Sequence, residues 1–346
     1  MNHFQNDNFL RACWGKQTDH TPVWFMRQAG RYMESYRRIR SKHEVLEICK
    51  TPSLSASITL DAANLLGVDA AILFADIMLP LEGMGVQLKI LDGGPSIEKP
   101  LRDAESVEHL ERLEPEKHVP FVMDSIRLIQ EKLDREIPLI GFSGAPFTLA
   151  SYLIEGGPSR DFTLTKKMMY GQPEVWSNLM TKLTDMVSAY LSAQIRAGVD
   201  AVQLFDTWSG CLSPSDYGEF VLPYTKKIFD HLEGKGVPRI HFGVGTAGIL
   251  NTMSKSGGEV FGVDWRIPID EAWNRLGRVA IQGNLDPAIV LGDWRLVEAR
   301  TDEILEKTGG RPGHVFSLGH GVLPETRPEQ LQKLVKFIHG STAKRR

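Results

Sequence analysis

The sequence predicts a single-domain (β/α)8 barrel of the TIM type, with a β-hairpin inserted after the second strand. Eight short apolar runs rich in Val, Ile and Phe recur along the 346 residues, and each precedes a turn and a longer segment of helical periodicity. Strands that alternate with helices pair in parallel, and eight such units close a barrel. No change of composition and no Ser/Pro-rich linker divides the chain, so we expect one domain over residues 1–346.

Each element follows from its local pattern. The predicted strands cover residues 23–26, 70–74, 138–142, 201–205, 239–242, 260–263, 279–282 and 315–318. Helical periodicity predicts helices over residues 44–66, 119–133, 173–196, 214–232, 288–306 and 328–339. Two β-like runs, 86–90 and 96–99, flank the turn Asp92-Gly93-Gly94 and predict the hairpin. We expect residues 341–346 to form a disordered basic tail.

The composition indicates which kinds of partner and location to expect. The 40 basic and 43 acidic residues nearly cancel, which argues against a nucleic-acid or membrane-surface protein. Three cysteines, Cys13, Cys49 and Cys211, form no CxxC or CxH pair, so we expect no disulfide framework and no zinc knuckle. No signal-peptide pattern opens the chain, and a cytoplasmic location is expected. Residues 137–154 are uncharged, but two prolines and two glycines predict strand, loop and helix start there rather than a membrane span.

Polar residues stand where the predicted strands end. The βα loops of such a barrel gather at the carboxyl ends of the strands, which predicts a site at that face. In chain order the residues at or just after the strand ends are Arg27, Asp76, Ser143, Asp206, Thr207, Gly243, Asp264, Asn284 and His320.

Residues 23–40 hold five arginines and a single acid, Glu34. Arg27 and Arg31 present planar forks that match carboxylates or phosphates, although they could equally pair with acids of neighbouring loops. Gly30 is expected to allow a tight backbone path before a helix that starts near Tyr32.

The other strand-end residues each keep two interpretations. Asp76 either caps the next helical turn or stays charged to face a developing cation. His320 lies between two glycines, so its ring is expected to be exposed, either solvated or as a donor to an anion. Tyr152 belongs to the cavity or to the core, and Thr207 to the site or to a helix N-cap.

A glycine-rich loop offers a competing interpretation. Gly243, Gly245 and Gly248 form GxGxxG after a strand, and Asp264 follows 16 residues beyond Gly248, as in a dinucleotide-binding motif. A doubly wound domain would need its own six-strand set around that point. An NAD-dependent dehydrogenase is therefore the less favoured alternative.

Over essentially its whole length the sequence resembles the uroporphyrinogen decarboxylase family of haem biosynthesis. The resemblance rests on long motifs in order, namely PVWFMRQAGRY (22–32), AILFADIMLP (71–80), PLIGFSGAPFTLASYLIEGG (138–157), QLFDTW (203–208), VDW (263–265), QGNLDP (282–287) and LGHGVLP (318–324). It implies a barrel that is usually a homodimer with facing clefts and that uses no metal and no organic cofactor. It also implies a reaction, the removal of CO2 from four acetate side chains of uroporphyrinogen III to give coproporphyrinogen III.

The resemblance also implies roles for residues. The substrate-binding set would be Arg27, Gln28, Ala29, Gly30, Arg31, Arg40, Asp76, Phe142, Tyr152, Thr207 and His320. Among these, Asp76, Arg27 and Arg31 would be catalytic, with Asp76 against the pyrrole nitrogens and an arginine as proton donor. Phe142 would belong to an apolar cavity wall. Thr207 keeps the hydroxyl of a serine found in some members.

Two rivals share parts of this pattern. Zinc-dependent methyltransferases of the same superfamily use an HxC element and a later cysteine, whereas here Phe242-Gly243 follows His241 and no cysteine lies beyond Cys211, which excludes thiolate ligation. A non-catalytic tetrapyrrole-binding protein would need arginines and a cavity, but it would have no use for Asp76 beneath the pyrroles.

Overall fold

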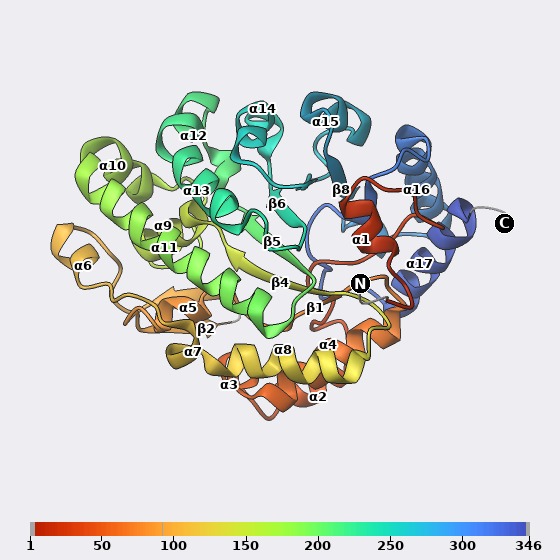
Figure 1. Ribbon diagram of the computed structural model, residues 1–346, viewed down its shortest axis with the longest axis horizontal. Helices are drawn as coiled ribbons and strands as arrows, with labels where there is room; N and C mark the ends of the chain where they lie inside the picture. Colours follow the sequence, from red (N-terminus) through yellow and green to blue (C-terminus); the bar gives the residue numbers. More distant parts are fainter. Residues whose placement is uncertain (1–3, 92, 344–346) are drawn as a thin grey trace.

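The computed structural model describes residues 4–91 and 93–343. Seven strands form one curled parallel sheet in the order β1-β4-β5-β6-β7-β8-β9, and helices cover its outside (Figure 1). The strands are β1 Ala71–Ile72, β4 Leu139–Gly144, β5 Ala201–Asp206, β6 Arg239–Gly243, β7 Val260–Gly262, β8 Ala280–Leu285 and β9 His314–Leu318. Seven of the eight predicted apolar runs are therefore strands of this sheet.

The first predicted run, 23–26, forms an isolated parallel bridge rather than a regular strand. Val23 pairs with Phe316, and the Phe316 N–H donates to the Pro22 carbonyl over 2.8 Å. On its other side, the Asp69 N–H donates to the Val23 carbonyl over 2.8 Å. The run lies between β9 and the start of β1, and it leaves extended geometry at Arg27, whose φ is 56°.

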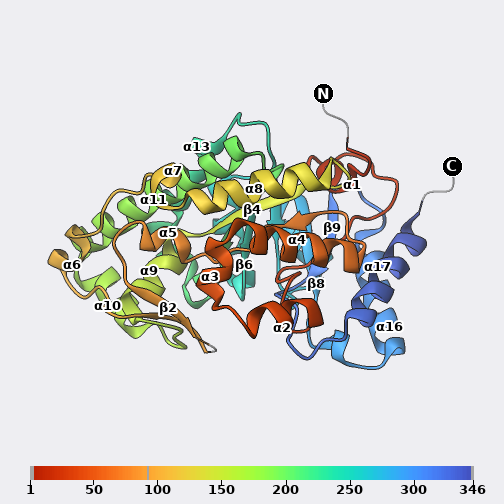
Figure 2. The same cartoon turned by 90° about the horizontal axis from the view of Figure 1, so that it is seen from below.

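The predicted hairpin is confirmed. β2 (Leu88–Leu91) pairs antiparallel with β3 (Gly94–Ile97) after the β1 unit. Figure 2 shows this hairpin extending outward between α10 (Thr163–Gly171) and α2 (Glu34–Arg40). Gly94 has a φ of 117°, and a Cβ there would lie 2.9 Å from Pro158 Cγ, so the turn requires glycine. Asp92 of the expected turn lies outside the described residues.

Three predicted helices are each split. Residues 44–66 form α3 (Val45–Lys50) and α4 (Pro52–Leu66), because Pro52 cannot continue a helix but can start one. Residues 214–232 divide likewise into α12 and α13 before Pro223. At 288–306, the Asp293 side chain accepts the Arg295 N–H and opens α16 after a short 3₁₀ turn, η4 (Ile289–Leu291).

The other helices begin and end as follows: α1 Asn8–Cys13, α2 Glu34–Arg40, α5 Leu79–Glu82, α6 Ala104–Glu108, α7 Pro115–His118, α8 Pro120–Leu133, α9 Pro146–Glu155, α10 Thr163–Gly171, α11 Pro173–Ala197, α12 Pro214–Phe220, α13 Leu222–Leu232, α14 Leu250–Met253, α15 Ile269–Leu276, α16 Trp294–Thr308 and α17 Pro328–Thr342. Short 3₁₀ turns are η1 Ser209–Cys211, η2 Thr246–Gly248 and η3 Ser254–Ser256. Ser341 and Thr342 end α17, so the expected disordered tail does not begin at 341, and residues 344–346 lie outside the described part.

The uncharged segment 137–154 is β4, a turn and most of α9, as its prolines and glycines predict. In the described ranges, no helix combines the length and apolar character that a bilayer crossing requires.

Candidate active site

Asp76 lies just beyond β1, at the carboxyl end of the parallel sheet. Its Oδ1 accepts the Met78 N–H over 2.9 Å, which holds the turn before α5, although the N-cap of that helix is Met78 and not Asp76. The side chain is half-buried. Burial raises the pKa of this carboxyl above its ordinary value, while the Met78 N–H and the charge of Arg27 oppose that rise. A buried carboxyl whose charged form is disfavoured in this way is a candidate functional group.

Arg27 is the centre of the strand-end cluster. Its positive charge acts on three groups from other elements: it opposes the rise that burial gives the pKa values of Asp76 and Tyr152, and it adds to the lowering that burial gives the pKa of His320. Its backbone is left-handed, which is rare for a residue with a Cβ and turns the chain sharply off the end of the first run. Gly30 was expected to provide this tight path. The structure assigns it to Arg27, because Gly30 has no positive φ and a Cβ on it would make only ordinary contacts.

His320 is half-buried rather than exposed, which corrects the expectation from its two flanking glycines. Burial and the nearby charge of Arg27 lower the pKa of the ring to about 4, so it is neutral at pH 7. Its Nδ1 accepts the Gly321 N–H over 2.6 Å. The proton of the neutral ring therefore sits on Nε2, and the ring can still donate to an anion.

Aromatic rings line the strand ends beside these polar groups. Phe142 meets Phe205 at 5.5 Å between ring centroids, Phe205 meets Phe242 at 5.9 Å, and Phe242 meets His320 at 6.4 Å. The row crosses β4, β5, β6 and the loop after β9. The role of Phe142 in the wall of a substrate cavity stays a prediction.

Tyr152 on α9 is half-buried and lies within electrostatic range of both Asp76 and Arg27. Burial raises the pKa of its phenol. Thr207 directly follows β5, and its neighbour Trp208 packs against Tyr152 with ring centroids 5.8 Å apart. The structure therefore brings five predicted residues to one end of the sheet, namely Arg27, Asp76, Tyr152, Thr207 and His320.

Arg31 and Arg40 form a second basic group. Both lower the pKa of Tyr36, which burial raises, and the Tyr36 ring lies 5.5 Å from Phe74 just before Asp76. Arg40 donates to the His43 carbonyl over 3.0 Å and pairs with Glu44 at 3.3 Å, so its guanidinium is partly engaged within the chain. Arg31 is exposed.

The segment between Arg27 and Arg31 is held by its own hydrogen bonds. The Tyr32 hydroxyl donates to the Gln28 carbonyl, and the Met33 N–H donates to the Gly30 carbonyl over 2.9 Å. Gln28 is buried, and its Nε2 has no hydrogen-bond partner among the residues that the structure covers. Ala29 packs against the core.

The glycine-rich loop lacks the features of a dinucleotide site. The Gly245 N–H donates to Asp264 Oδ2 over 2.8 Å, and Arg266 pairs with the same carboxylate. The acid that would have bound a ribose is thus already engaged, and the following helix, α14, has four residues. His241, of the HFG element, is buried with its Nδ1 against Ser256 Oγ at 2.9 Å.

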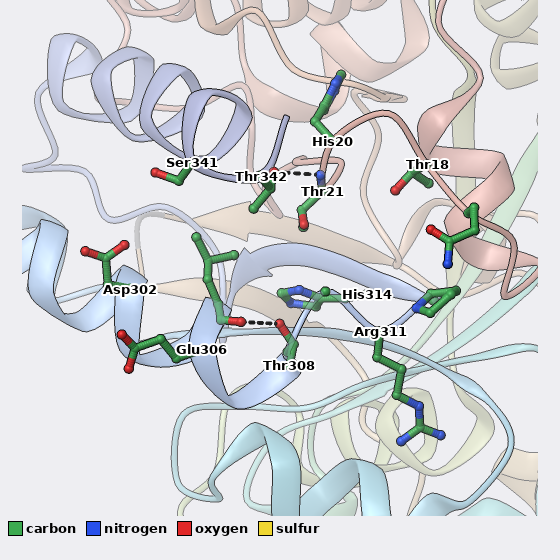
Figure 3. A pocket seen from close by; sticks show the side chains of 15 residues that line it. Thr18, His20, Thr21, Asp302, Glu306, Thr308, Arg311, His314, Ser341 and Thr342 are labelled. Atoms are coloured by element: carbon green, nitrogen blue, oxygen red, sulfur yellow. Dashed lines mark hydrogen bonds between the residues drawn. The ribbon is translucent and has the colours of Figure 1, made fainter. Parts of the chain in front are cut away.

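A cavity of about 410 Å³ lies at the opposite, amino end of the sheet (Figure 3). Its lining includes His314 at the start of β9, Thr308 at the end of α16 and Thr342 at the end of α17. Residue placement, rather than cavity size, identifies the candidate site, because the predicted residues Arg27, Asp76, Tyr152 and His320 lie at the other end of the strands, where the loops of such a fold gather.

Beside this cavity, the buried carboxylate of Asp69 joins distant parts of the chain. Its Oδ1 accepts from His20 Nε2 and Asn6 Nδ2, each over 2.7 Å, and its Oδ2 accepts from His339 Nε2 over 2.8 Å and the Val23 N–H over 2.7 Å. The possible ligand atoms of His20, Asp69 and His339 all lie within 4.8 Å of one another, a spacing that would suit a metal ion. Four donors already satisfy both oxygens, which indicates a structural clamp. Sequence reasoning missed it, since no local pattern links residues so far apart.

Gly321 supplies a contact that the sequence did not reveal. A Cβ on Gly321 would lie 2.6 Å from Cδ and 2.8 Å from Cγ of Arg27, so Gly321→Ala must push the Arg27 side chain aside. We expect the catalytic efficiency, kcat/KM, to fall roughly 10- to 100-fold, as for other misplaced binding groups. Circular dichroism should show an unchanged fold. Gly340→Ala, where a Cβ meets nothing within 4 Å, is the control that should keep full activity; equal kinetics in both variants would contradict the contact.

The fold and the site together define a class of protein. It is an α/β protein with a candidate site at the carboxyl ends of parallel strands, where a carboxylate whose pKa is raised by burial lies among guanidinium groups and aromatic rings. Residues 4–341 match the family described as "Uroporphyrinogen decarboxylase (URO-D)". The chain is 52% identical over 336 residues to a uroporphyrinogen decarboxylase of Sorangium cellulosum, covering 96% of each chain. It is 49% identical over 335 residues to one of Geobacter metallireducens, covering 96% of this chain and 98% of that one. The chain belongs to the uroporphyrinogen decarboxylase family.

Among solved structures, a methyltransferase from Methanosarcina mazei superimposes with a TM-score of 0.82, covering 98% of this chain and 99% of that one. Its sequence identity is 20%, so this likeness concerns the fold alone.

Proposed function

We propose that this protein removes CO2 from the four acetate side chains of uroporphyrinogen III, leaving methyl groups and giving coproporphyrinogen III, with no metal or organic cofactor. Its family makes it a decarboxylase of uroporphyrinogen in haem biosynthesis. The observation that carries the finer proposal is the position of the Asp76 carboxyl at the carboxyl ends of the strands, within electrostatic range of Arg27. The substrate has eight carboxylates around a ring whose pyrrole N–H groups point inward, so it needs donors at its edge and an anion at its centre.

The chemistry assigns a role to each group. A proton adds to a pyrrole carbon and creates an iminium-like cation, into which the electron pair of the breaking C–C bond flows as CO2 leaves. The new methylene then takes up a proton, the ring carbon releases one, and a methyl group and a pyrrole result. Ionised Asp76 stabilises the cation more strongly than it stabilises the substrate, which lowers the barrier.

We assign proton delivery to Arg27 and the binding of peripheral carboxylates to Arg31 and Arg40. Arg27 acts electrostatically on Asp76, Tyr152 and His320, whereas Arg31 is exposed and lies with Arg40 around Tyr36. Neutral His320 and the Tyr152 and Thr207 hydroxyls supply further donors to carboxylates. Gln28, Ala29 and Gly30 shape the segment between the two arginines, and Phe142 packs against the macrocycle.

We also propose that the first run completes a closed eight-stranded barrel. The hydrogen bonds from Phe316 to Pro22 and from Asp69 to Val23, on its two sides, support this arrangement. A homodimer with facing clefts and a cytoplasmic location are proposals that rest on the family resemblance.

Incubation with uroporphyrinogen III under anaerobic conditions, followed by oxidation and chromatography, tests the activity. We expect products with seven, six, five and four carboxylates in succession, unaffected by chelators or by added NAD. Unchanged substrate that nevertheless copurifies with the protein would instead favour a tetrapyrrole carrier. A reaction that requires NAD or stops with chelator would refute the cofactor-free mechanism.

A further inference from the structure

We propose that Trp208 is a positioning residue for this reaction, whose indole N–H binds the Tyr152 oxygen and so turns the phenolic proton toward a carboxylate of the bound substrate. The inference deepens the proposed function and rests on it. It concerns a residue to which neither the sequence patterns nor the family resemblance gave a role.

One face of α9 holds Trp208 in place. The Trp208 backbone N–H donates to Thr148 Oγ1 over 3.3 Å, and the Thr148 hydroxyl in turn donates to the buried Asp206 carboxylate over 3.3 Å. Tyr152 lies four residues after Thr148, on the same face of the helix. Thr148 therefore fixes the main chain of Trp208, and Tyr152 meets its side chain.

The indole ring is packed on two sides. Its centroid lies 5.8 Å from that of Tyr152 at an interplanar angle of 64°, and 5.4 Å from that of Phe162 at 48°. With Phe162 on one side and α9 on the other, the ring has little freedom to turn away from Tyr152.

The indole N–H is buried and lacks a hydrogen-bond partner within residues 4–91 and 93–343. This group can only donate, and a buried donor without an acceptor is costly. It lies near enough to Tyr152 to lower the pKa of the phenol, against the larger effect of burial, but the pair falls short of hydrogen-bond geometry. Hydrogen bonds of this kind commonly tighten when substrate binds.

A hydrogen bond from Trp208 would determine which way the Tyr152 hydroxyl proton points. A hydroxyl has one proton, so an oxygen that accepts from Trp208 must donate to a different group. Asp76 and Arg27 both act electrostatically on Tyr152, which places the phenol beside the proposed substrate cavity. A substrate carboxylate is the acceptor that this arrangement suits, and Trp208 acts on it through Tyr152.

A double-mutant cycle tests this coupling. Trp208→Phe removes the N–H and keeps an aromatic ring between Tyr152 and Phe162, and we expect kcat/KM to fall about tenfold. Tyr152→Phe should cost at least as much. The double variant should be no slower than Tyr152→Phe alone, and the same non-additivity should appear in the affinity for coproporphyrinogen, which needs no turnover. Phe162→Leu keeps the indole N–H and the Tyr152 hydroxyl but loosens the packing of the indole ring. It should lower kcat/KM in the wild-type protein and should not lower it further when Tyr152→Phe is already present.

Trp176→Phe is the matched control. Trp176 lies on α11, and its indole N–H donates to the Phe220 carbonyl over 3.0 Å. The substitution removes this hydrogen bond, so it should lower the stability of the protein and leave kcat/KM unchanged. The positioning role would be overturned if the losses in kcat/KM of the two single variants multiplied in the double variant. It would also be overturned if Trp208→Phe kept wild-type kinetics and affinity. A wild-type protein that binds the tetrapyrrole without converting it would count against the proposed function, while the binding cycle would still decide the Trp208–Tyr152 coupling.

Discussion

Asp76→Asn is expected to lower kcat roughly 10²- to 10³-fold, the cost of removing one preorganised electrostatic group. The amide oxygen can still accept the Met78 N–H, so the loop after β1 should keep its shape. What the substitution removes is the negative charge that would face the cationic intermediate. Product chromatography under single-turnover conditions measures the loss directly.

The same variant should be more stable than the wild type at neutral pH. Burial raises the folded-state pKa of Asp76 above its ordinary value of about 4, so the free energy of unfolding starts to fall as the pH rises through that ordinary value, and the loss is complete above the folded-state pKa. Below the ordinary value both folded and unfolded states carry the proton, and the difference from Asn should vanish. Urea unfolding at several pH values checks this sign.

Asp302→Asn is the matched control for Asp76. Burial also raises the pKa of Asp302, but this residue lines the cavity at the opposite end of the sheet. It should therefore keep wild-type turnover. Full activity of Asp76→Asn, or equal losses in the two variants, would contradict the role of Asp76.

Asp69→Ala is expected to give the largest loss of stability, about 3–5 kcal/mol, because it leaves His20, His339, Asn6 and the Val23 N–H without their acceptor. The clamp joins the N-terminal segment, the start of β1 and α17, so the whole fold should loosen. The midpoint of urea unfolding at pH 7 measures the effect. Asp19→Ala, which removes an exposed carboxylate 3.6 Å from Arg11, should change the midpoint little.

The pH dependence gives the Asp69 prediction a second test. Burial acts to raise the pKa of Asp69, but hydrogen bonds from His20 and His339 outweigh it and hold the pKa below its ordinary value. The stability that the carboxylate contributes is therefore present above about pH 4 and is lost as the pH falls through the folded-state pKa. The difference between wild type and Asp69→Ala should shrink on acidification. A difference that grew below pH 4 would contradict the clamp.

Sequence patterns predicted most of the sheet because a strand buried on both faces needs a continuous apolar run. They also placed Asp76, Tyr152 and His320 near one another, because parallel strands bring their carboxyl ends to one edge. The interpretation of His320 as an exposed ring failed. Glycines next to a residue indicate backbone freedom, whereas Gly321 serves here to make room for the Arg27 side chain.

Contacts between distant residues were beyond local patterns. The Asp69 clamp depends on His20 and His339, which lie near opposite ends of the chain, and the orientation of Trp208 depends on α9 and Phe162. The left-handed backbone of Arg27 was also unforeseen, because a non-glycine residue adopts it only where surrounding structure imposes it. Pro52 and Pro223 indicate helix breaks in the sequence. The prediction nevertheless gave one continuous helix at each place, because the residues on both sides of the proline share a helical periodicity.

The most direct test is a structure of the protein with coproporphyrinogen III bound. We expect the pyrrole nitrogens within hydrogen-bonding distance of the Asp76 carboxylate, and the propionates on Arg31, Arg40 and their neighbours at the carboxyl ends of the strands. Product seated in the cavity at the amino end of the sheet, or bound with Asp76 turned away from its ring, would contradict the account.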